Sequence, residues 1–356
     1  MTMRTTRAFA AFWVAIAIPG VTSKARGQGE DIRAVEVLME GRALATEHVA
    51  ELEKRLVANP DDLDSRTRLL GYYWSRQFEH PEEAATRQGH VFWIVEHAPG
   101  TGVAGSVGVE LDAVLEPAAY QEGSRLWRKQ AEDHANEPVV LGNAANYFLI
   151  HDSARAEEFY KKARALDPDS PKWARRLAQV MSLRMIGASD EKRAGLATEA
   201  LRYREESVAL DKSPQARSEA LCDLAELACE AREWKKARSY ATELVEQASS
   251  AAPDQSGDAA HAGNTVLGRL ALRDGDLEEA KRRLLDSGAV SGSPGLDTSG
   301  PSMVLAEELL RSGERDAVLE YLGRCTRFWK GDRGRLDLWA KDIREGRTPD
   351  FGSQGR

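Results

Sequence analysis

The stretch that decides the fold runs from Glu137 to Ser170 and reads EPVVLGNAANYFLIHDSARAEEFYKKARALDPDS. Its small and aromatic residues recur at intervals of three and four, which is the spacing of one face of an α-helix. From about Asp31 onward the rest of the chain keeps this periodicity, without the sustained two-residue alternation of a half-buried strand. The sequence therefore predicts an all-α protein.

The arrangement of small residues returns twice further along the chain, with Ala225 and Ala237 in one copy and Gly268 and Ala280 in the next. A small residue on each of two helices lets their backbones approach closely. Prolines also recur every 30 to 46 residues: Pro60, Pro99, Pro138, Pro168, Pro214, Pro253 and Pro294. In an all-helical chain this period predicts stacked helical hairpins, which bury their apolar faces against their neighbours.

Six residues of the opening stretch have the size and aromatic character that the tetratricopeptide repeat favours at the same positions: Ala144, Tyr147, Ala156, Tyr160, Ala163 and Pro168. The chain resembles this family, in an exported bacterial form, strongly over residues 137–170 and 218–285 and over about two-thirds of its length in all. The resemblance implies a right-handed superhelical solenoid of helix-turn-helix repeats. HEAT-like or other solenoids of helix pairs are the alternative.

The first residues have the layout of a secretory signal peptide. Arg4 and Arg7 precede residues 8–21, which carry no charge and are too short, at about 1.5 Å per residue, to cross a bilayer. We therefore expect a signal peptide at 1–27, a periplasmic or secreted product, and no transmembrane anchoring after cleavage. An uncleaved anchor or an N-terminal core helix is the alternative.

Three further segments follow the expected signal peptide. The pattern predicts one N-terminal helix within 28–60, from Asp31 to Val57, repeats over 61–330, and a capping segment at 331–356. Leu336, Trp339 and Ile343 recur there at helical spacing, as in a helix that covers the last repeat. Glycine-rich or polar stretches at 99–109, 249–258 and 287–301 are predicted to be flexible insertions.

Composition excludes several classes of protein. The 356 residues include 49 basic and 57 acidic side chains, a net charge of −8, which argues against wrapping nucleic acid. Cys222 and Cys229 lie seven residues apart on one predicted helix, about 10.5 Å along its axis, which is too far for a disulfide. Together with Cys325 they are expected to be buried thiols.

Motifs that would carry chemistry are weak. Gly100-Thr-Gly102-Val-Ala-Gly105 fits a dinucleotide-binding string after the strand-like residues 91–95, but no second strand with an acidic residue follows. The histidines lack metal-ligand spacing, and Asp167-Pro-Asp169 is explained by helix capping. No nucleophile stands in a recognisable context. We expect no enzyme activity, no cofactor and no metal.

In the family that the chain resembles, the first helix of each hairpin lines a concave groove that holds extended peptides or partner helices. Carried over to this sequence, the groove positions include Arg68, Lys172, Arg175, Arg176, Glu226, Arg269 and Arg273. Asn143 and Asn264 do not match the family's carboxylate clamp. We therefore expect a scaffold or adaptor that binds one or more proteins, with acidic partner segments held by Lys172, Arg175 and Arg176. A lipid or cell-wall ligand in the groove, a solvated helix face and an enzyme are the alternatives.

Overall fold

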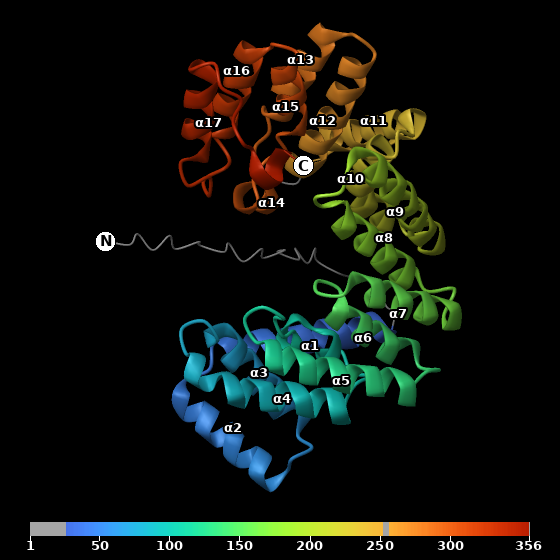
Figure 1. Cartoon of the computed structure of the whole chain (residues 1–356), viewed down its shortest axis with the longest axis vertical. Helices are drawn as coiled ribbons and strands as arrows, with labels where there is room; N and C mark the ends of the chain where they lie inside the picture. Colours follow the sequence, from blue (N-terminus) through green and yellow to red (C-terminus); the bar gives the residue numbers. More distant parts are fainter. Residues whose placement is uncertain (1–25, 252–255, 356) are drawn as a thin grey trace.

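The computed structural model describes residues 26–251 and 256–355, and every regular element in these residues is helical. The all-α prediction is therefore confirmed for this part of the chain. The helices follow one another around an open arc, with α1–α6 at one end, α7–α11 along its side and α12–α17 at the other end (Figure 1). Apart from Arg26 and Gly27, which begin α1, the predicted signal peptide lies outside the described residues.

The α-helices, in chain order, are α1 Arg26–Arg42, α2 Thr46–Ala58, α3 Leu63–Arg76, α4 Ala84–His97, α5 Pro117–Asp133, α6 Pro138–Phe148, α7 Ser153–Leu166, α8 Pro171–Met185, α9 Asp190–Leu210, α10 Pro214–Glu230, α11 Trp234–Ser250, α12 Gly257–Arg273, α13 Leu277–Ser287, α14 Pro294–Thr298, α15 Val304–Arg311, α16 Arg315–Cys325 and α17 Arg335–Arg344. Short 3-10 turns are η1 Pro81–Glu83, η2 Val103–Gly105, η3 Val107–Val109 and η4 Gly352–Gly355. No helix in the described residues is both long enough and apolar enough to cross a bilayer.

The middle of the chain is a row of helical hairpins. α6 packs on α7, α8 on α9, α10 on α11 and α12 on α13, and each hairpin also contacts the next. The small residues predicted at the helix crossings, including Ala225 and Ala237, are fully buried. At Gly268 an added methyl group would overlap Leu305 of α15 and crowd the Cβ of Arg283 on the partner helix α13. The close approach predicted from these residues is therefore confirmed.

The prediction of a single N-terminal helix is wrong, because the segment forms two helices, α1 and α2, on either side of α3. Leu38 of α1 belongs to the main core, whereas Leu56 of α2 packs in a separate cluster with Leu69 and with Tyr72. α1 crosses α3 so closely that a methyl group on Gly71 would overlap the carbonyl oxygen of Leu38. The chain breaks after α1 because its two halves bury apolar faces on opposite sides of α3.

Two of the stretches predicted to be flexible insertions are packed instead. Residues 99–109 contain the turns η2 and η3, and Val103 and Val109 are almost fully buried in the main core. Asn143 of α6 donates hydrogen bonds to two carbonyl oxygens of this stretch, at 2.9 and 3.0 Å. Residues 287–301 contain α14, whose Leu296 is also buried. Glycine-rich sequence here permits tight backbone packing rather than mobility.

The C-terminal segment closes the end of the arc. α17 packs on α16, and Leu336, Trp339 and Ile343 are buried as their helical spacing predicts. The ring of Trp339 lies 5.8 Å from that of Trp329 and 5.1 Å from that of Phe351, between ring centroids. This aromatic cluster covers apolar side chains of the last hairpin that water would otherwise reach.

Candidate functional site

A groove of about 1050 Å³ is lined by the first helices of three successive hairpins, α8, α10 and α12. These helices run from the side of the arc to the beginning of its C-terminal end (Figure 1). We call this groove the α8–α12 groove. Side chains of α9 reach into it, and residues 295–304 with Gln354 close one end. Its lining mixes small apolar residues with an unusual number of charged ones: Arg175, Arg176, Arg193, Arg204, Asp223, Glu226, Glu230, Asp258 and Arg269.

The α8 wall of the groove carries two arginines without an acidic partner. Arg176 donates a hydrogen bond to Gln179 at 2.9 Å, and neither Arg175 nor Arg176 forms an ion pair with any described residue. Withdrawal from bulk water, together with the guanidinium groups of Arg176 and Arg204, lowers the pKa of Arg175. The carboxylates of Glu219 and Asp211 oppose this shift, and the charge of Arg176 acts on Glu110, but none of these acids forms an ion pair with either arginine. Because an arginine stays charged at neutral pH, this wall presents positive charge that no direct ion pair with a described residue holds.

The α12 wall is different, because its arginine belongs to a chain of ion pairs across four helices. Arg269 contacts Glu230 of α10 at 2.8 Å and Glu308 of α15 at 2.9 Å. Glu230 also accepts a hydrogen bond from Arg193 of α9 at 2.5 Å. Although burial opposes ionisation, Arg269 and Arg193 hold the pKa of Glu230 below its usual value. The chain ties neighbouring hairpins together and leaves Arg269 little charge to offer a ligand.

Between these walls, α10 places Glu226 without a hydrogen bond or ion pair to any described residue. Solvent reaches the carboxylate, but the groove walls surround it. This partial desolvation, together with the neighbouring carboxylates of Asp223 and Glu230, raises the pKa of Glu226 to about 7. Asp223 itself is paired with Arg204 at 2.8 Å. Among the α10 carboxylates that line the groove, Glu226 is therefore the one without a described partner and is available to a ligand.

The thiol of Cys222 also lines the groove, one turn of α10 before Glu226. Burial and the negative charges of Glu226 and Asp223 raise the pKa of Cys222 to about 12. A thiol with such a pKa is almost wholly protonated at neutral pH and is a poor nucleophile. The expectation of unpaired thiols is confirmed, since Cys222, Cys229 and Cys325 are all free.

His261 of α12 fixes the closed end of the groove. Its ring is buried, with Nδ1 3.0 Å from the carbonyl oxygen of Ser287 and Nε2 accepting the backbone N–H of Ser302 at 2.9 Å. The first contact requires a proton on Nδ1 and the second a bare Nε2, so the ring is neutral. Burial lowers the pKa of His261 in agreement with this. This histidine holds the 295–304 wall against α12.

The structure brings together four of the seven predicted groove residues. Those that line the α8–α12 groove are Arg175, Arg176, Glu226 and Arg269. The other three lie elsewhere. Arg68 of α3 forms ion pairs with Glu40 of α1 and with Asp64 of α3, at the N-terminal end of the arc.

Lys172 and Arg273 each lie beside an aromatic ring instead of in the groove. The Lys172 Nζ lies 5.2 Å from the ring centroid of Trp173. Arg273 lies 4.5 Å from the ring of Trp234 and pairs with Asp274 at 2.6 Å. The predicted three-cation patch on α8 is therefore reduced, within the groove, to Arg175 and Arg176.

Sequence reasoning missed the side chains that enter the groove from outside the first helices. Arg193 and Arg204 come from α9, a second helix, and Gln354 comes from the C-terminal turn η4. Asp258 and His261 lie on α12, where no charge pattern singles them out. A rule that reads only first-helix positions cannot find residues contributed by a longer second helix or by a distant loop.

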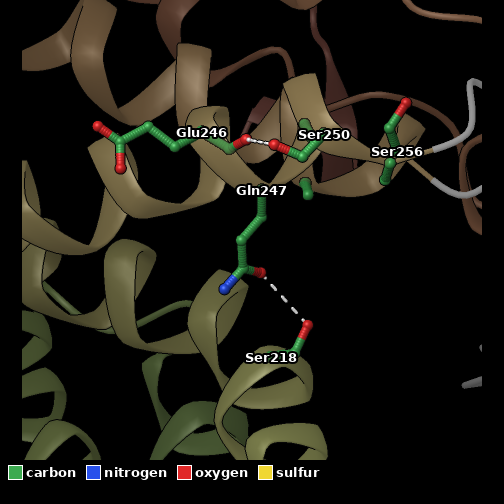
Figure 2. A pocket seen from close by; sticks show the side chains of 8 residues that line it. Ser218, Glu246, Gln247, Ser250 and Ser256 are labelled. Carbon is green, nitrogen blue, oxygen red and sulfur yellow. Dashed lines mark hydrogen bonds between the residues drawn. The ribbon is translucent and has the colours of Figure 1, made fainter.

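Other places in the described residues offer less chemistry. A cavity of about 540 Å³ near the ends of α10, α11 and α12 has Glu246 as its one titratable lining residue (Figure 2). There Ser218 donates to Gln247 at 3.3 Å. His80, Glu82 and Glu83 could jointly reach a metal ion, but Glu82 is engaged by His80 and Glu83 by Arg76.

The dinucleotide-like string does not form a nucleotide-binding turn. The preceding residues 91–95, which resemble a strand in sequence, lie inside α4. Gly105 packs so tightly on α6 that an added methyl group would overlap the side chain of Asn143. Its glycines therefore serve close packing between elements.

Comparison with known proteins gives no relative from which a function could be transferred: no family model matches the chain, and no curated protein matches its sequence. The α8–α12 groove is thus the feature of the described residues from which function has to be argued. It offers binding chemistry, namely free charges of both signs on a wide and open surface, without a group poised for nucleophilic attack.

Proposed function

We propose that the chain is a non-enzymatic scaffold or adaptor that binds other proteins through the α8–α12 groove. The observation that carries this proposal is the pair of arginines without an ion pair to a described residue, Arg175 and Arg176, in a groove of about 1050 Å³ that extends over three hairpins. Opposite charges on a partner would be attracted to this wall and would gain charge-assisted hydrogen bonds there.

The hairpin architecture supports the same proposal. Stacked helix pairs with small residues such as Ala225 and Ala237 at their crossings are what the tetratricopeptide-like interpretation requires. Such arrays present extended surfaces on which a partner chain can lie across several repeats. We therefore keep the tetratricopeptide-like solenoid as part of the proposal.

The proposed place of action is the cell envelope or exterior. The support is the sequence of residues 1–27, with Arg4 and Arg7 ahead of a short apolar run, as in a secretory signal peptide. Export would deliver the groove to partners outside the cytoplasm. N-terminal sequencing of the mature protein tests this part: a start within residues 22–30 is expected, and an intact Met1 would contradict it.

Site-specific photo-crosslinking tests the binding function. A photoreactive amino acid replaces Ser182, which lines the groove, and in a matched protein it replaces Lys235, an exposed residue of α11 outside the groove. Irradiation in the native host's envelope fraction should attach a polypeptide at position 182 and not at position 235. Mass spectrometry then identifies the attached segment, which is expected to contain acidic residues.

The same experiment with Arg175→Glu and Arg176→Glu decides whether the basic wall does the binding. The reversed charges should abolish the crosslink at position 182. A crosslink of equal yield after reversal, or none above the level of position 235, would contradict the proposal. Attachment of a lipid or a cell-wall fragment in place of a polypeptide would favour a non-protein ligand.

A further inference from the structure

The free charges of the groove lie on two different helices and have opposite signs. Arg175 and Arg176 are on α8, and Glu226 is on α10, two helices along the chain. None of the three forms an ion pair with a described residue, whereas Arg193, Arg204 and Arg269 in the same groove all do. Asp258 of α12 also forms no ion pair with a described residue, but it accepts a hydrogen bond from Ser293 at 2.6 Å. The groove therefore has a positive contact point on α8 and a negative one on α10 that no described side chain occupies.

The position of Glu226 gives it few ways to gain a partner within the protein. The nearest cation on α12, Arg269, is held by Glu230 and Glu308 on either side. Arg204 of α9 is already paired with Asp223 of α10. A carboxylate that is partly withdrawn from water and lacks a partner is costly, and an incoming cation would relieve that cost.

From this placement we infer that the groove recognises a polypeptide segment of mixed charge, whose acidic side chains contact Arg175 and Arg176 and whose basic side chain contacts Glu226. The inference rests on the proposed protein-binding function and makes it specific. It replaces the expectation of a purely acidic partner segment with one that carries both signs in a fixed order along the groove.

The geometry of helices and extended chains limits the spacing of those charges. α8 and α10 are joined through α9, which packs against both. Packed helices lie about 8–10 Å apart, so α8 and α10 are separated by up to about 16–20 Å. Because an extended chain rises about 3.3 Å per residue, an acidic and a basic side chain up to about five or six residues apart match the two contact points.

Selection from a random peptide library displayed on phage tests this inference on the full-length chain. The wild-type protein should enrich peptides that carry acidic residues and, at a fixed spacing of up to about six positions, a lysine or arginine. The Glu226→Gln protein should keep the acidic preference and lose the basic one. The Arg175→Glu, Arg176→Glu protein should lose the acidic preference.

Synthetic versions of the enriched peptides give the magnitude. Replacing the basic residue of such a peptide by serine should weaken its binding to the wild type about fivefold and leave its binding to Glu226→Gln unchanged. Matched controls are Glu132→Gln and Lys235→Glu, which change exposed residues outside the groove and should behave as the wild type.

The outcomes separate this inference from the function on which it rests. Enrichment of acidic peptides with no basic residue at a fixed spacing would overturn the mixed-charge inference and leave the binding function standing. Enrichment that shows no charge pattern, or that is unaffected by the reversal of Arg175 and Arg176, would overturn both.

Discussion

The α8 and α12 walls of the groove carry arginines that look alike in sequence but differ in their electrostatic surroundings. Arg175 faces the groove without an acidic partner, whereas Arg269 lies between Glu230 and Glu308. The residues that neutralise Arg269 are each 39 residues away, on the preceding and the following first helix. One wall is thus available to a ligand, and the other holds the hairpins together.

In this helical array, whether a charged side chain is neutralised depends on the residues at equivalent positions of the neighbouring hairpins. Glu230, Arg269 and Glu308 alternate in sign at nearly corresponding places, so each satisfies the next. On α8 the pattern stops, because the charges of Arg176 and of Arg204 from α9 act on Arg175 more strongly than those of Glu219 and Asp211 do. A break in an alternating series marks the place where an external partner is needed.

The largest effect is expected from breaking the α12 wall. Arg269→Ala leaves Glu230 and Glu308 without their shared cation in partly buried surroundings, and should lower the free energy of unfolding by about 2–3 kcal/mol. Chemical denaturation followed by circular dichroism measures this. Arg175→Ala is the matched control and should change it by no more than about 0.5 kcal/mol. Equal losses from the two variants would contradict the distinction between the walls.

The next effect concerns the protonation of the α12 wall. Folding lowers the pKa of His261 from its unfolded value of about 6.5. As the pH falls, the imidazole is therefore protonated in the unfolded chain before it is protonated in the folded one. Stability should therefore be complete above about pH 6.5 and decline as the pH falls, by up to about 1.4 kcal/mol per pH unit.

Comparison of His261→Gln with the wild type isolates this contribution. The variant lacks the titrating ring, so its unfolding midpoint should depend less on pH between about 5 and 7. Asp258, which lies one turn away on α12, opposes the shift and is present in both proteins. A steeper acid dependence in the variant would mean that His261 is not neutral in the folded state.

A smaller effect sharpens the difference in ligand binding. Arg175→Ala removes a cation that has no ion pair, and it should weaken the binding of an acidic peptide about fivefold. Arg273→Ala removes an arginine that stacks on Trp234 and pairs with Asp274, outside the groove. It should leave the affinity unchanged in the same fluorescence titration. A loss of affinity in Arg273→Ala equal to that in Arg175→Ala would place the binding surface elsewhere.

The smallest effect is on the floor of the groove, at Glu226. Folding raises its pKa from 4.5 to about 7, through desolvation and the charges of Asp223 and Glu230, against the opposing charge of Arg269. The folded state therefore loses stability as the pH rises through about 7. Glu226→Gln should be more stable than the wild type at about pH 8, by no more than about 0.5 kcal/mol, and equal to it near pH 4. A difference that shrinks as the pH rises would contradict this sign.

Sequence periodicity predicted the helices and the hairpin crossings, since these depend on local spacing and on small residues such as Ala225 and Ala237. It did not predict the break between α1 and α2. Nor did it predict that Gly41 and Gly71 allow α1 and α3 to touch backbone to backbone. A contact between distant residues leaves no periodic signal, and the glycine-rich stretch 99–109 was misread as flexible for the same reason.

The candidate site was predicted only in part. Of the residues predicted from first-helix positions, Arg175, Arg176, Glu226 and Arg269 line the groove, and their role in binding a partner stays a prediction. First-helix positions could not show which arginines are neutralised, because Arg269 finds its partners through packing of three hairpins. Nor could they give Arg204, which enters from the second helix α9.

The central claim is that the unneutralised α8 wall binds acidic polypeptide. Titration of a fluorescent peptide of consecutive glutamates with the full-length chain tests it most directly, at low ionic strength where such attraction is least screened. The wild type and Lys235→Glu should bind the peptide with equal affinity. The double variant Arg175→Glu, Arg176→Glu should bind it at least about tenfold more weakly. Equal affinity in the wild type and the reversed variant would contradict the account.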